Sequence, residues 1–229
     1  MKRLVFFTGA GISEESGVKT FRDSGGLWEG HDVMEVASIQ GWHSNKKMVL
    51  DFYNQRRRQL HEVKPNAAHV AISELQAQFE VIVITQNVDD LHERAGSKNI
   101  IHLHGELMKS RSEIDSSLIY ERPFDINLGD TNEFNHQLRP HIVWFGEAVN
   151  FMEEVIELAI SADIFIVVGT SLQVFPAAGI IDYLPSHIPL YYIDPKPAIT
   201  SSLTRLRNAK IISEKATIGM KLLIREIID

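Results

Sequence analysis

Short apolar runs recur along the chain, and longer segments with a helical spacing of apolar residues separate many of them. Most runs are continuous rather than alternating, which is typical of strands covered on both faces. Strands alternating with helices predict an α/β fold with a doubly wound, Rossmann-like parallel sheet. The predicted strands are residues 4–8, 79–85, 100–103, 141–145, 164–168, 190–193 and 210–212.

The segments between these runs predict helices with recognisable ends. Asn66 is a suitable N-cap for the first helix, and Gly96 follows the second where a left-handed residue often ends a helix. Pro176 starts the fourth helix, where its missing N–H costs nothing. The predicted helices are residues 67–78, 89–95, 151–161, 176–184 and 217–228.

Two segments interrupt this alternation and predict a second, smaller module. Residues 27–65 carry helical patterns without a convincing strand, and residues 106–139 are polar and irregular. We expect both insertions to form one small, mainly helical module beside the sheet. Residues 1–26, 66–105 and 140–229 then form the dinucleotide-binding domain, and a cleft between the two parts suits a ligand.

Composition and charge exclude several classes of protein. Of 229 residues, 44% are hydrophobic, and the formal charge is −7, so a basic surface for nucleic acid is not expected. No apolar run approaches the ~20 residues that span a membrane. The chain has no cysteine, which excludes disulfides and thiolate metal sites and fits a cytoplasmic protein.

Four polar segments come together at one edge of the predicted sheet. They are Gly-Ala-Gly-Ile-Ser at 9–13, Gln-Asn-Val-Asp at 86–89, His104-Gly105 and Gly-Thr-Ser at 169–171. Three of them directly follow a predicted strand, and ligands of open parallel sheets bind at the carboxyl ends of the strands. The sequence therefore predicts one composite site.

The first glycine turn is ambiguous when taken alone. The next glycine is Gly17, too late for the usual dinucleotide fingerprint, so a tight strand-to-helix turn without a ligand is an equal alternative. The second turn, at Gly169, and Asp194 after the strand at 190–193 favour a dinucleotide. Glycines admit a pyrophosphate close to the backbone, and the aspartate accepts from ribose hydroxyls.

The polar residues after the strand at 79–85 suit a carboxamide and ribose hydroxyls, because they both donate and accept hydrogen bonds. For Asp89, helix capping is the better interpretation, but capping leaves Gln86 and Asn87 unexplained. His104 ends the strand at 100–103 and suits a general base near neutral pH. His102 points to the opposite face and is assigned a structural role.

These motifs together resemble the sirtuin family of NAD-dependent protein lysine deacylases. The match includes Gly-Ala-Gly-Ile-Ser-x-x-Ser-Gly with Phe21-Arg22, Thr-Gln-Asn-Val-Asp-x-Leu-His at 85–92, His104-Gly105, Val-Trp-Phe-Gly-Glu at 143–147, Gly-Thr-Ser and Pro-Ala-Ala at 176–178. The matching segments follow the family order from residue 4 to about residue 216.

The resemblance implies a role for each matching residue. His104 is the implied catalytic base. NAD is the implied cofactor, with Gly9, Ala10, Gly11, Ile12, Ser13, Phe21, Arg22, Gln86, Asn87, Asp89, Gly169, Thr170, Ser171, Asp194 and Ala216 in its site. The acylated lysine of a protein is the implied partner, and Val143, Trp144, Phe145, Gly146 and Glu147 pair with its peptide as an added strand, unless they form an ordinary sheet strand.

The resemblance also implies the chemistry. The acyl-lysine carbonyl oxygen attacks the nicotinamide ribose and expels nicotinamide, and His104 then activates a ribose hydroxyl. Lysine and 2′-O-acyl-ADP-ribose are released. Two other classes stay open: an NAD glycohydrolase or ADP-ribosyltransferase on the same fold, and a non-catalytic module that binds NAD or an acyl peptide.

The segment 48–60 bears on the acyl group. Tyr53 and Arg56 share one helical face, whereas Arg57 and Arg58 are predicted to be solvated. A guanidinium on an apolar stripe needs an anionic partner, which is either an internal carboxylate or a ligand. Tyr-x-x-Arg resembles the class III branch, which also removes succinyl, malonyl and glutaryl groups, and Ala37 matches its small residue beside the longer acyl chain.

The chain departs from the family in two places. Sirtuins commonly bind a structural zinc through four cysteines near residues 106–139, and this chain has none, so we predict no metal. Asp90 replaces the usual Gly or Asn beside the nicotinamide pocket, at the first turn of a helix where a carboxylate is favourable.

Overall fold

A six-stranded parallel sheet forms the centre of the computed structural model, which describes residues 1–19, 27, 28 and 30–228. The strands lie in the order β11-β10-β9-β1-β4-β5. Their bounds are β1 Arg3–Thr8, β4 Glu80–Thr85, β5 Ile100–His102, β9 Ile164–Val168, β10 Leu190–Ile193 and β11 Ala209–Ile212.

This order places a switch point between β1 and β9. From β1 the chain winds outward through β4 to β5, and from β9 it winds the other way through β10 to β11. All neighbouring strands are parallel, so their carboxyl ends share one edge. The crevice outside a switch point is the usual ligand site of such sheets. The predicted Rossmann-like fold is confirmed.

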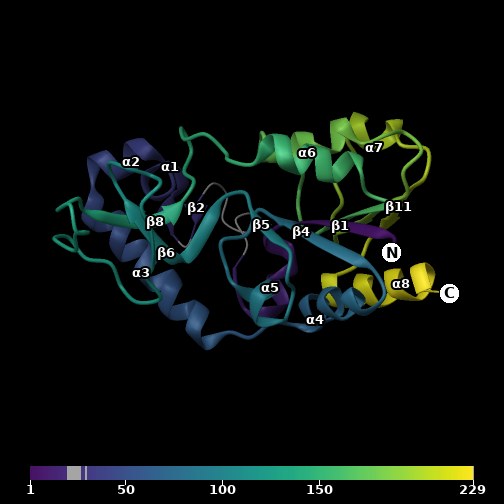
Figure 1. The fold of residues 1–229 in the computed structure, drawn as a ribbon, viewed down its shortest axis with the longest axis horizontal. Coiled ribbons are helices and arrows are strands. Elements are labelled where there is room, and N and C mark those ends of the chain that lie inside the picture. The colour runs from purple at the N-terminus through teal and green to yellow at the C-terminus, as the bar shows by residue number, and fades with distance from the viewer. Residues whose placement is uncertain (20–26, 29, 229) are drawn as a thin grey trace.

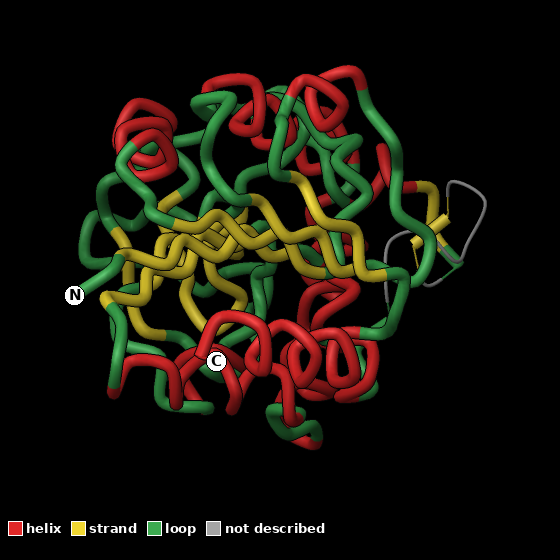
Figure 2. The backbone as a smooth tube through the Cα atoms, turned by 90° about the vertical axis from the view of Figure 1, so that its right-hand side faces the viewer, coloured by secondary structure: helices red, strands yellow, loops and turns green. Residues whose placement is uncertain are grey.

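Helices cover both faces of the sheet (Figures 1 and 2). Alternate residues of β1 enter opposite cores: Val5 and Phe7 face one side, and Leu4 and Phe6 the other. The continuous apolar runs follow from this double burial. The first face is covered by α6 (Met152–Ile160), the 3-10 helix Ala177–Tyr183 and α7 (Ser201–Arg205), and the second by α4 (Ala67–Glu74) and α8 (Ala216–Ile228).

Local signals explain most helix ends. The Asn66 side chain accepts a hydrogen bond from the Ala68 N–H, and His69 completes a capping box, so the predicted N-cap of α4 is confirmed. Gly96 has a φ of 99° just after α5 (Leu91–Arg94), as a left-handed end of a helix requires. The helix predicted at 176–184 is a 3-10 helix at Ala177–Tyr183.

The small module lies at the other end of the molecule from α8, at the left of Figure 1. It contains more strand than we predicted. Residues 106–139, expected to be irregular, contribute to a three-stranded antiparallel sheet. The polar residues Ser110 and Arg111 are both buried in β6, so this strand shows no apolar alternation in the sequence. The elements are β2 Leu27–Trp28, β3 His31–Asp32, α1 Val33–Val36, α2 Ile39–Ser44, α3 Lys46–Glu62, β6 Gly105–Ser112, β7 Ile119–Glu121 and β8 Leu138–Ile142.

The strand predicted at 141–145 begins and ends three residues earlier, as β8. Beyond β8 the chain leaves the sheet, and Phe145 forms an isolated parallel bridge with Ser38. Gly146 then turns with a φ of 93°. Residues 143–147 are therefore a connecting segment rather than a sheet strand.

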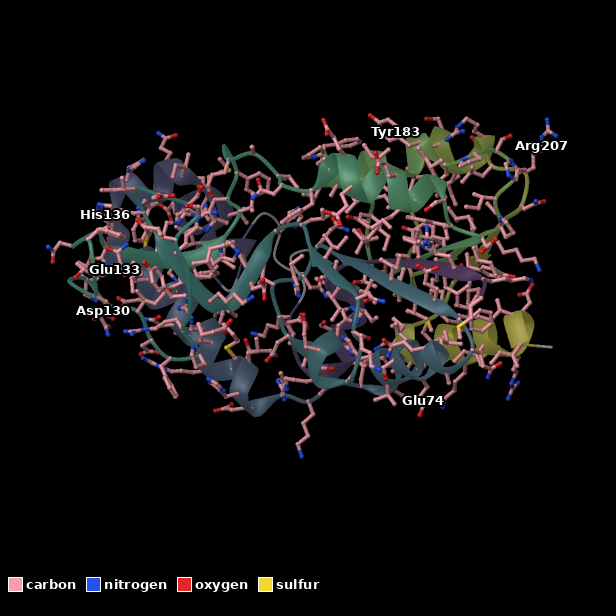
Figure 3. The ribbon with its side chains drawn as sticks, in the orientation of Figure 1. Glu74, Asp130, Glu133, His136, Tyr183 and Arg207 are labelled. Atoms are coloured by element: carbon pink, nitrogen blue, oxygen red, sulfur yellow. The ribbon has the colours of Figure 1, made fainter. Side chains whose placement is uncertain are left out.

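Hydrogen bonds hold the long turn between β7 and β8. The amide of Gln137 reaches the carbonyls of Asn127, Asp130 and Leu138 at 2.9–3.1 Å, and its oxygen accepts from the Gly129 N–H at 2.8 Å. The turn forms the end of the module farthest from the central sheet, where Figure 3 labels Asp130, Glu133 and His136.

A buried asparagine ties this turn to α3. The Asn54 side chain donates to the Ile126 carbonyl at 2.8 Å and accepts from the Ile126 N–H at 2.9 Å. Its amide oxygen also accepts from Arg57 at 2.9 Å. Because Asn54 and Arg57 are both buried, these bonds replace water that neither side chain can reach.

We predict that Asn54→Leu destabilises the protein by about 1–3 kcal/mol, because it leaves both backbone groups of Ile126 and the Arg57 guanidinium without this partner. Urea unfolding measures the change. Asn127→Leu in the same turn is the control, since that side chain is exposed. Equal stabilities of the two variants would contradict this prediction, and stoichiometric zinc in the purified protein would contradict the metal-free module.

Candidate functional site

Two glycine turns touch each other at the switch point. The Gly9 N–H donates to the Val168 carbonyl at 3.0 Å, and the Gly11 N–H to the Gly169 carbonyl at 2.8 Å. A Cβ on Gly169 would lie 2.3 Å from the Ile12 nitrogen, and one on Gly11 would lie 2.7 Å from the Gly169 Cα. Gly169 also has a φ of 63°. These glycines let the two turns pack backbone against backbone.

This packing changes the predicted use of the glycine N–H groups. Those of Gly9 and Gly11 have carbonyl acceptors within the protein, so they are not available to a pyrophosphate. Among the described residues, the N–H groups of Ala10, Thr170 and Ser171 have no acceptor. The outward donors of the two turns therefore come from the residues between and after the glycines.

Side chains from the turn after β4 bind to both glycine turns. Gln86 Nε2 donates to the Thr170 hydroxyl at 2.9 Å. Asn87 Nδ2 lies 3.2 Å from the Gly9 carbonyl and 3.2 Å from the Ser13 hydroxyl. The structure thus brings together three of the four predicted segments through direct hydrogen bonds.

Asp89 precedes the N-cap residue of α5 and is part of this cluster. One carboxylate oxygen accepts from the Leu91 N–H at 3.2 Å, and the other accepts from the Ser13 hydroxyl at 2.9 Å. Burial raises the pKa of Asp89 to about 6, although both hydrogen bonds lower it. Asp90, not Asp89, is the N-cap residue of α5, so the capping interpretation of Asp89 is wrong in position; Asp89 lies one residue earlier, binds the Leu91 N–H and faces Ser13.

His104 joins the cluster through the backbone. Its Nδ1 lies 3.0 Å from the Gln86 carbonyl, and because a carbonyl only accepts, Nδ1 carries the proton. Nε2 of the neutral ring then bears a lone pair. Burial lowers the pKa of His104, which keeps the ring neutral near pH 7. A neutral, oriented imidazole of this kind is suited to accept a proton.

His102 has the opposite character. Its Nδ1 lies 2.9 Å from the Asn87 carbonyl and its Nε2 lies 2.7 Å from a Glu93 carboxylate oxygen. Both partners only accept, so the ring donates from both nitrogens as an imidazolium. Burial opposes this charge, but the hydrogen bond and charge of Glu93 prevail and raise the pKa of His102. Its contacts are structural, as predicted.

The far end of the predicted nucleotide site is also buried. Asp194 follows β10, and one of its oxygens accepts from the Lys196 N–H at 2.8 Å. Ala216 begins α8 and is 4% exposed. Glu15 reaches across from the first glycine turn and caps α8 by accepting from the N–H and hydroxyl of Thr217 at 3.0 and 2.9 Å. No local spacing in the sequence links Glu15 to α8, so this contact was not predicted.

A small cavity of about 50 Å³ lies where the sheet edge meets the small module. Arg56 of α3 and Asp89 both line it, together with Trp28, Val88 and Leu107. Arg56 lies over the Phe52 ring at 4.4 Å from its centroid. The predicted acyl-binding arginine and the predicted nicotinamide-pocket aspartate therefore share one cavity.

Tyr53 is placed differently from Arg56. It is 0% exposed, its hydroxyl bonds to the Trp144 indole, and its ring lies edge-on to Trp28 with centroids 6.2 Å apart. Ala37 lies at the junction with residues 143–147, because its carbonyl accepts from the Phe145 N–H at 2.9 Å. Tyr53 does not line the cavity that holds Arg56, and Trp28, which does, packs against its ring.

The segment 143–147 makes most of its contacts within the protein. The Val143 N–H donates to the His104 carbonyl at 2.9 Å, which places this segment beside the site. The Glu147 carboxylate bonds to Arg139, Arg111 and the Trp144 N–H. The Glu147 side chain therefore holds the segment in place, whereas the Phe145 side chain is exposed.

Comparison with known proteins identifies the family. A model described as "Sir2 family" matches residues 9–176, which is most of the chain. The chain belongs to the Sir2 family. It is 56% identical over 229 residues to an NAD-dependent protein deacylase of Helicobacter pylori, covering 100% of this chain and 99% of the relative.

Solved Sir2 structures share the whole fold. A Sir2 homologue in complex with NAD superposes with a TM-score of 0.86 at 35% identity, covering 99% of this chain and 89% of the other. A Sir2 protein bound to an acetylated peptide gives a TM-score of 0.78 at 27% identity, covering 97% and 92%. The central sheet and the small module are thus those of the Sir2 family.

Two predictions need correction or lie outside the structure. Arg57, predicted to be solvated, is fully buried, because it lies one helical turn from Tyr53 on the inner face of α3. Arg58 is exposed, as predicted, and pairs with Asp125. Phe21 and Arg22 lie outside the described residues.

Two buried histidines behind the site were not predicted as a group. His69 lies 3.5 Å from the Ser13 hydroxyl, and His92 lies 3.0 Å from the Thr8 hydroxyl. Their rings meet edge to face with centroids 4.9 Å apart. Burial lowers the pKa of both, so they are neutral supports for the residues above them.

Neither a metal centre nor a membrane span is found in the part of the chain that the structure describes. No three His, Asp or Glu side chains there gather as metal ligands would. No helix there has the length and apolar character that crossing a bilayer needs.

We predict that Glu93→Gln lowers stability by about 1 kcal/mol in mildly acidic solution and has little effect at high pH. The pKa of His102 is higher in the folded protein than in the unfolded chain, so protonated His102 contributes fully to stability below its unfolded pKa of about 6.5. This contribution is lost as the pH rises through the folded pKa. The pKa of Glu93 is lower in the folded protein, so ionised Glu93 contributes to stability above its unfolded pKa of about 4.3.

Urea unfolding at pH 5.5 and pH 9 tests this difference. Glu121→Gln is the control, since that carboxylate is 79% exposed and lies 3.8 Å from Lys109. A Glu93→Gln effect of the same size at both pH values would show that the charge of His102 is not involved.

Proposed function

We propose that this chain is an NAD-dependent protein lysine deacylase that removes succinyl and malonyl groups as well as acetyl groups. The observation that carries the acyl preference is the cavity lined by both Arg56 and Asp89. It joins a guanidinium, suited to a carboxylate, to the candidate nicotinamide pocket. The Helicobacter pylori relative named as a deacylase supports the reaction class.

The residues present fit NAD at the switch point. The outward N–H groups of Ala10, Thr170 and Ser171 suit phosphate oxygens, because they have no acceptor among the described residues. Asp194 and Ala216 suit the adenine ribose and adenine. Ser13, Gln86, Asn87 and Asp89 form the nicotinamide end. When bound, NAD supplies a nicotinamide leaving group and a ribose that accepts the acyl group.

His104 is the proposed catalytic base. The Gln86 carbonyl fixes its tautomer, so Nε2 is free to take a proton from a hydroxyl of the bound substrate. Burial keeps the ring unprotonated at neutral pH. Residues 143–147, beside His104, hold the peptide that carries the acyl-lysine, and the proposed product is 2′-O-acyl-ADP-ribose.

Mass spectrometry of the products tests the reaction class. Purified protein is incubated with NAD and matched succinyl-lysine or acetyl-lysine peptides. Acyl-ADP-ribose together with free lysine peptide is expected, and His104→Tyr is expected to abolish both. Nicotinamide without acyl-ADP-ribose would move the protein to the glycohydrolase class. Wild-type activity in His104→Tyr would instead indicate another base.

We predict that Arg56→Met lowers kcat/KM for a succinyl peptide by about 10- to 100-fold, the range for losing a hydrogen bond to a charged group. Deacetylation should change by less than about threefold, because an acetyl group has no carboxylate. Steady-state kinetics with both peptides measure the ratio. Arg58→Met is the matched control on the same helix, since Arg58 is exposed. Equal losses for both peptides in Arg56→Met would exclude recognition of the tail by this residue.

A further inference from the structure

The side chains of Trp144 and Tyr53 form a buried pair between segment 143–147 and α3. The Trp144 Nε1 lies 2.8 Å from the Tyr53 hydroxyl oxygen, and the rings lie 6.0 Å apart. Both side chains are almost completely buried. This bond links a residue of segment 143–147 to the helix that carries Arg56.

The direction of this hydrogen bond is determined by chemistry. An indole N–H only donates, so the Tyr53 oxygen must accept. The hydroxyl proton of Tyr53 then points elsewhere, and among the described residues it has no acceptor. Burial raises the pKa of Tyr53, so the hydroxyl keeps that proton. Tyr53 of α3 is thus a buried O–H donor whose oxygen already accepts a hydrogen bond from Trp144.

The indole itself is held by charged groups. The Arg139 guanidinium lies over the Trp144 ring at 3.4 Å from its centroid. Arg139 donates two hydrogen bonds to Glu147, at 2.7 and 2.9 Å, and the same carboxylate accepts from the backbone N–H of Trp144 at 2.8 Å. Arg111 binds Glu147 as well, at 2.7 Å. Two guanidinium groups share one carboxylate, so this support carries a positive charge.

We propose that Trp144 is a positioning residue that determines acyl specificity. Its N–H occupies the Tyr53 oxygen and directs the Tyr53 hydroxyl proton to the carboxylate of a dicarboxylic acyl group. Arg139 packs on the indole ring, and Glu147 holds the Trp144 backbone and Arg139. The inference rests on the proposed function, because it assigns to Trp144 a part in recognising the succinyl or malonyl tail.

The first test measures kcat/KM of wild type and of Trp144→Phe with three peptides that have the same sequence and differ only in the acyl group. The acyl groups are acetyl, butyryl and succinyl, where butyryl has the same chain length as succinyl without its charge. We expect kcat/KM for succinyl to fall about tenfold more than for butyryl, mainly through KM. A general loss of packing would lower succinyl and butyryl equally, which would overturn the proposal.

Trp42→Phe is the matched control for loss of an indole in the same core. Trp42 is buried, its ring lies 5.5 Å from that of Trp144, and its indole donates to Glu113 rather than to Tyr53. The succinyl-to-butyryl ratio of this variant should equal that of wild type. A fall as large as that of Trp144→Phe would assign the effect to packing.

A double-mutant cycle with Tyr53→Phe tests whether Trp144 acts through Tyr53. If it does, Trp144→Phe has little further effect on the succinyl-to-butyryl ratio once the Tyr53 hydroxyl is gone. Independent, additive losses would overturn the proposal. A wild-type protein that removes acetyl but not succinyl would instead refute the proposed acyl preference itself, so the two failures are distinguishable.

Discussion

The close contact between the turns after β1 and β9 is the constraint on which the rest of the site depends. Gly11 and Gly169 allow their backbones to approach and hydrogen bond at 2.8 Å, where any side chain would collide. This contact closes the switch point of the sheet. The glycines therefore build the floor of the site, while Ala10, Thr170 and Ser171 present its donors.

The proposed nicotinamide end depends on this floor. Gln86 and Asn87 reach from the turn after β4 to Thr170 and Gly9, and His102 and His104 bind the carbonyls of Asn87 and Gln86 from the next strand. Two histidines two residues apart thus hold successive peptide groups, one as a cation and one neutral. A single strand end supplies both a rigid support and a candidate base.

The sequence predicted the central sheet well because both faces of each strand are apolar, as Val5 and Phe6 illustrate. The same rule failed for β6, where Ser110 and Arg111 are buried and Arg111 pairs with Glu147, far along the chain. It also placed Arg57 in solvent, since spacing alone does not show that Asn54 provides a buried partner. The polar segments at strand ends could be predicted from the sequence. Contacts between distant residues, such as Glu15 with Thr217, could not, because only the folded chain brings them together.

The turn held by Gln137 and Asn54 has a chemical consequence. Carbonyl and amide groups hold it, and the chain contains no cysteine. A thiolate metal centre is lost when an oxidant or a competing chelator reaches it, whereas hydrogen bonds between amide and carbonyl groups react with neither. The six methionines are the only sulfur atoms in the chain, so peroxide has no thiol to attack. The small module therefore contains no thiolate centre that an oxidant or a chelator could break.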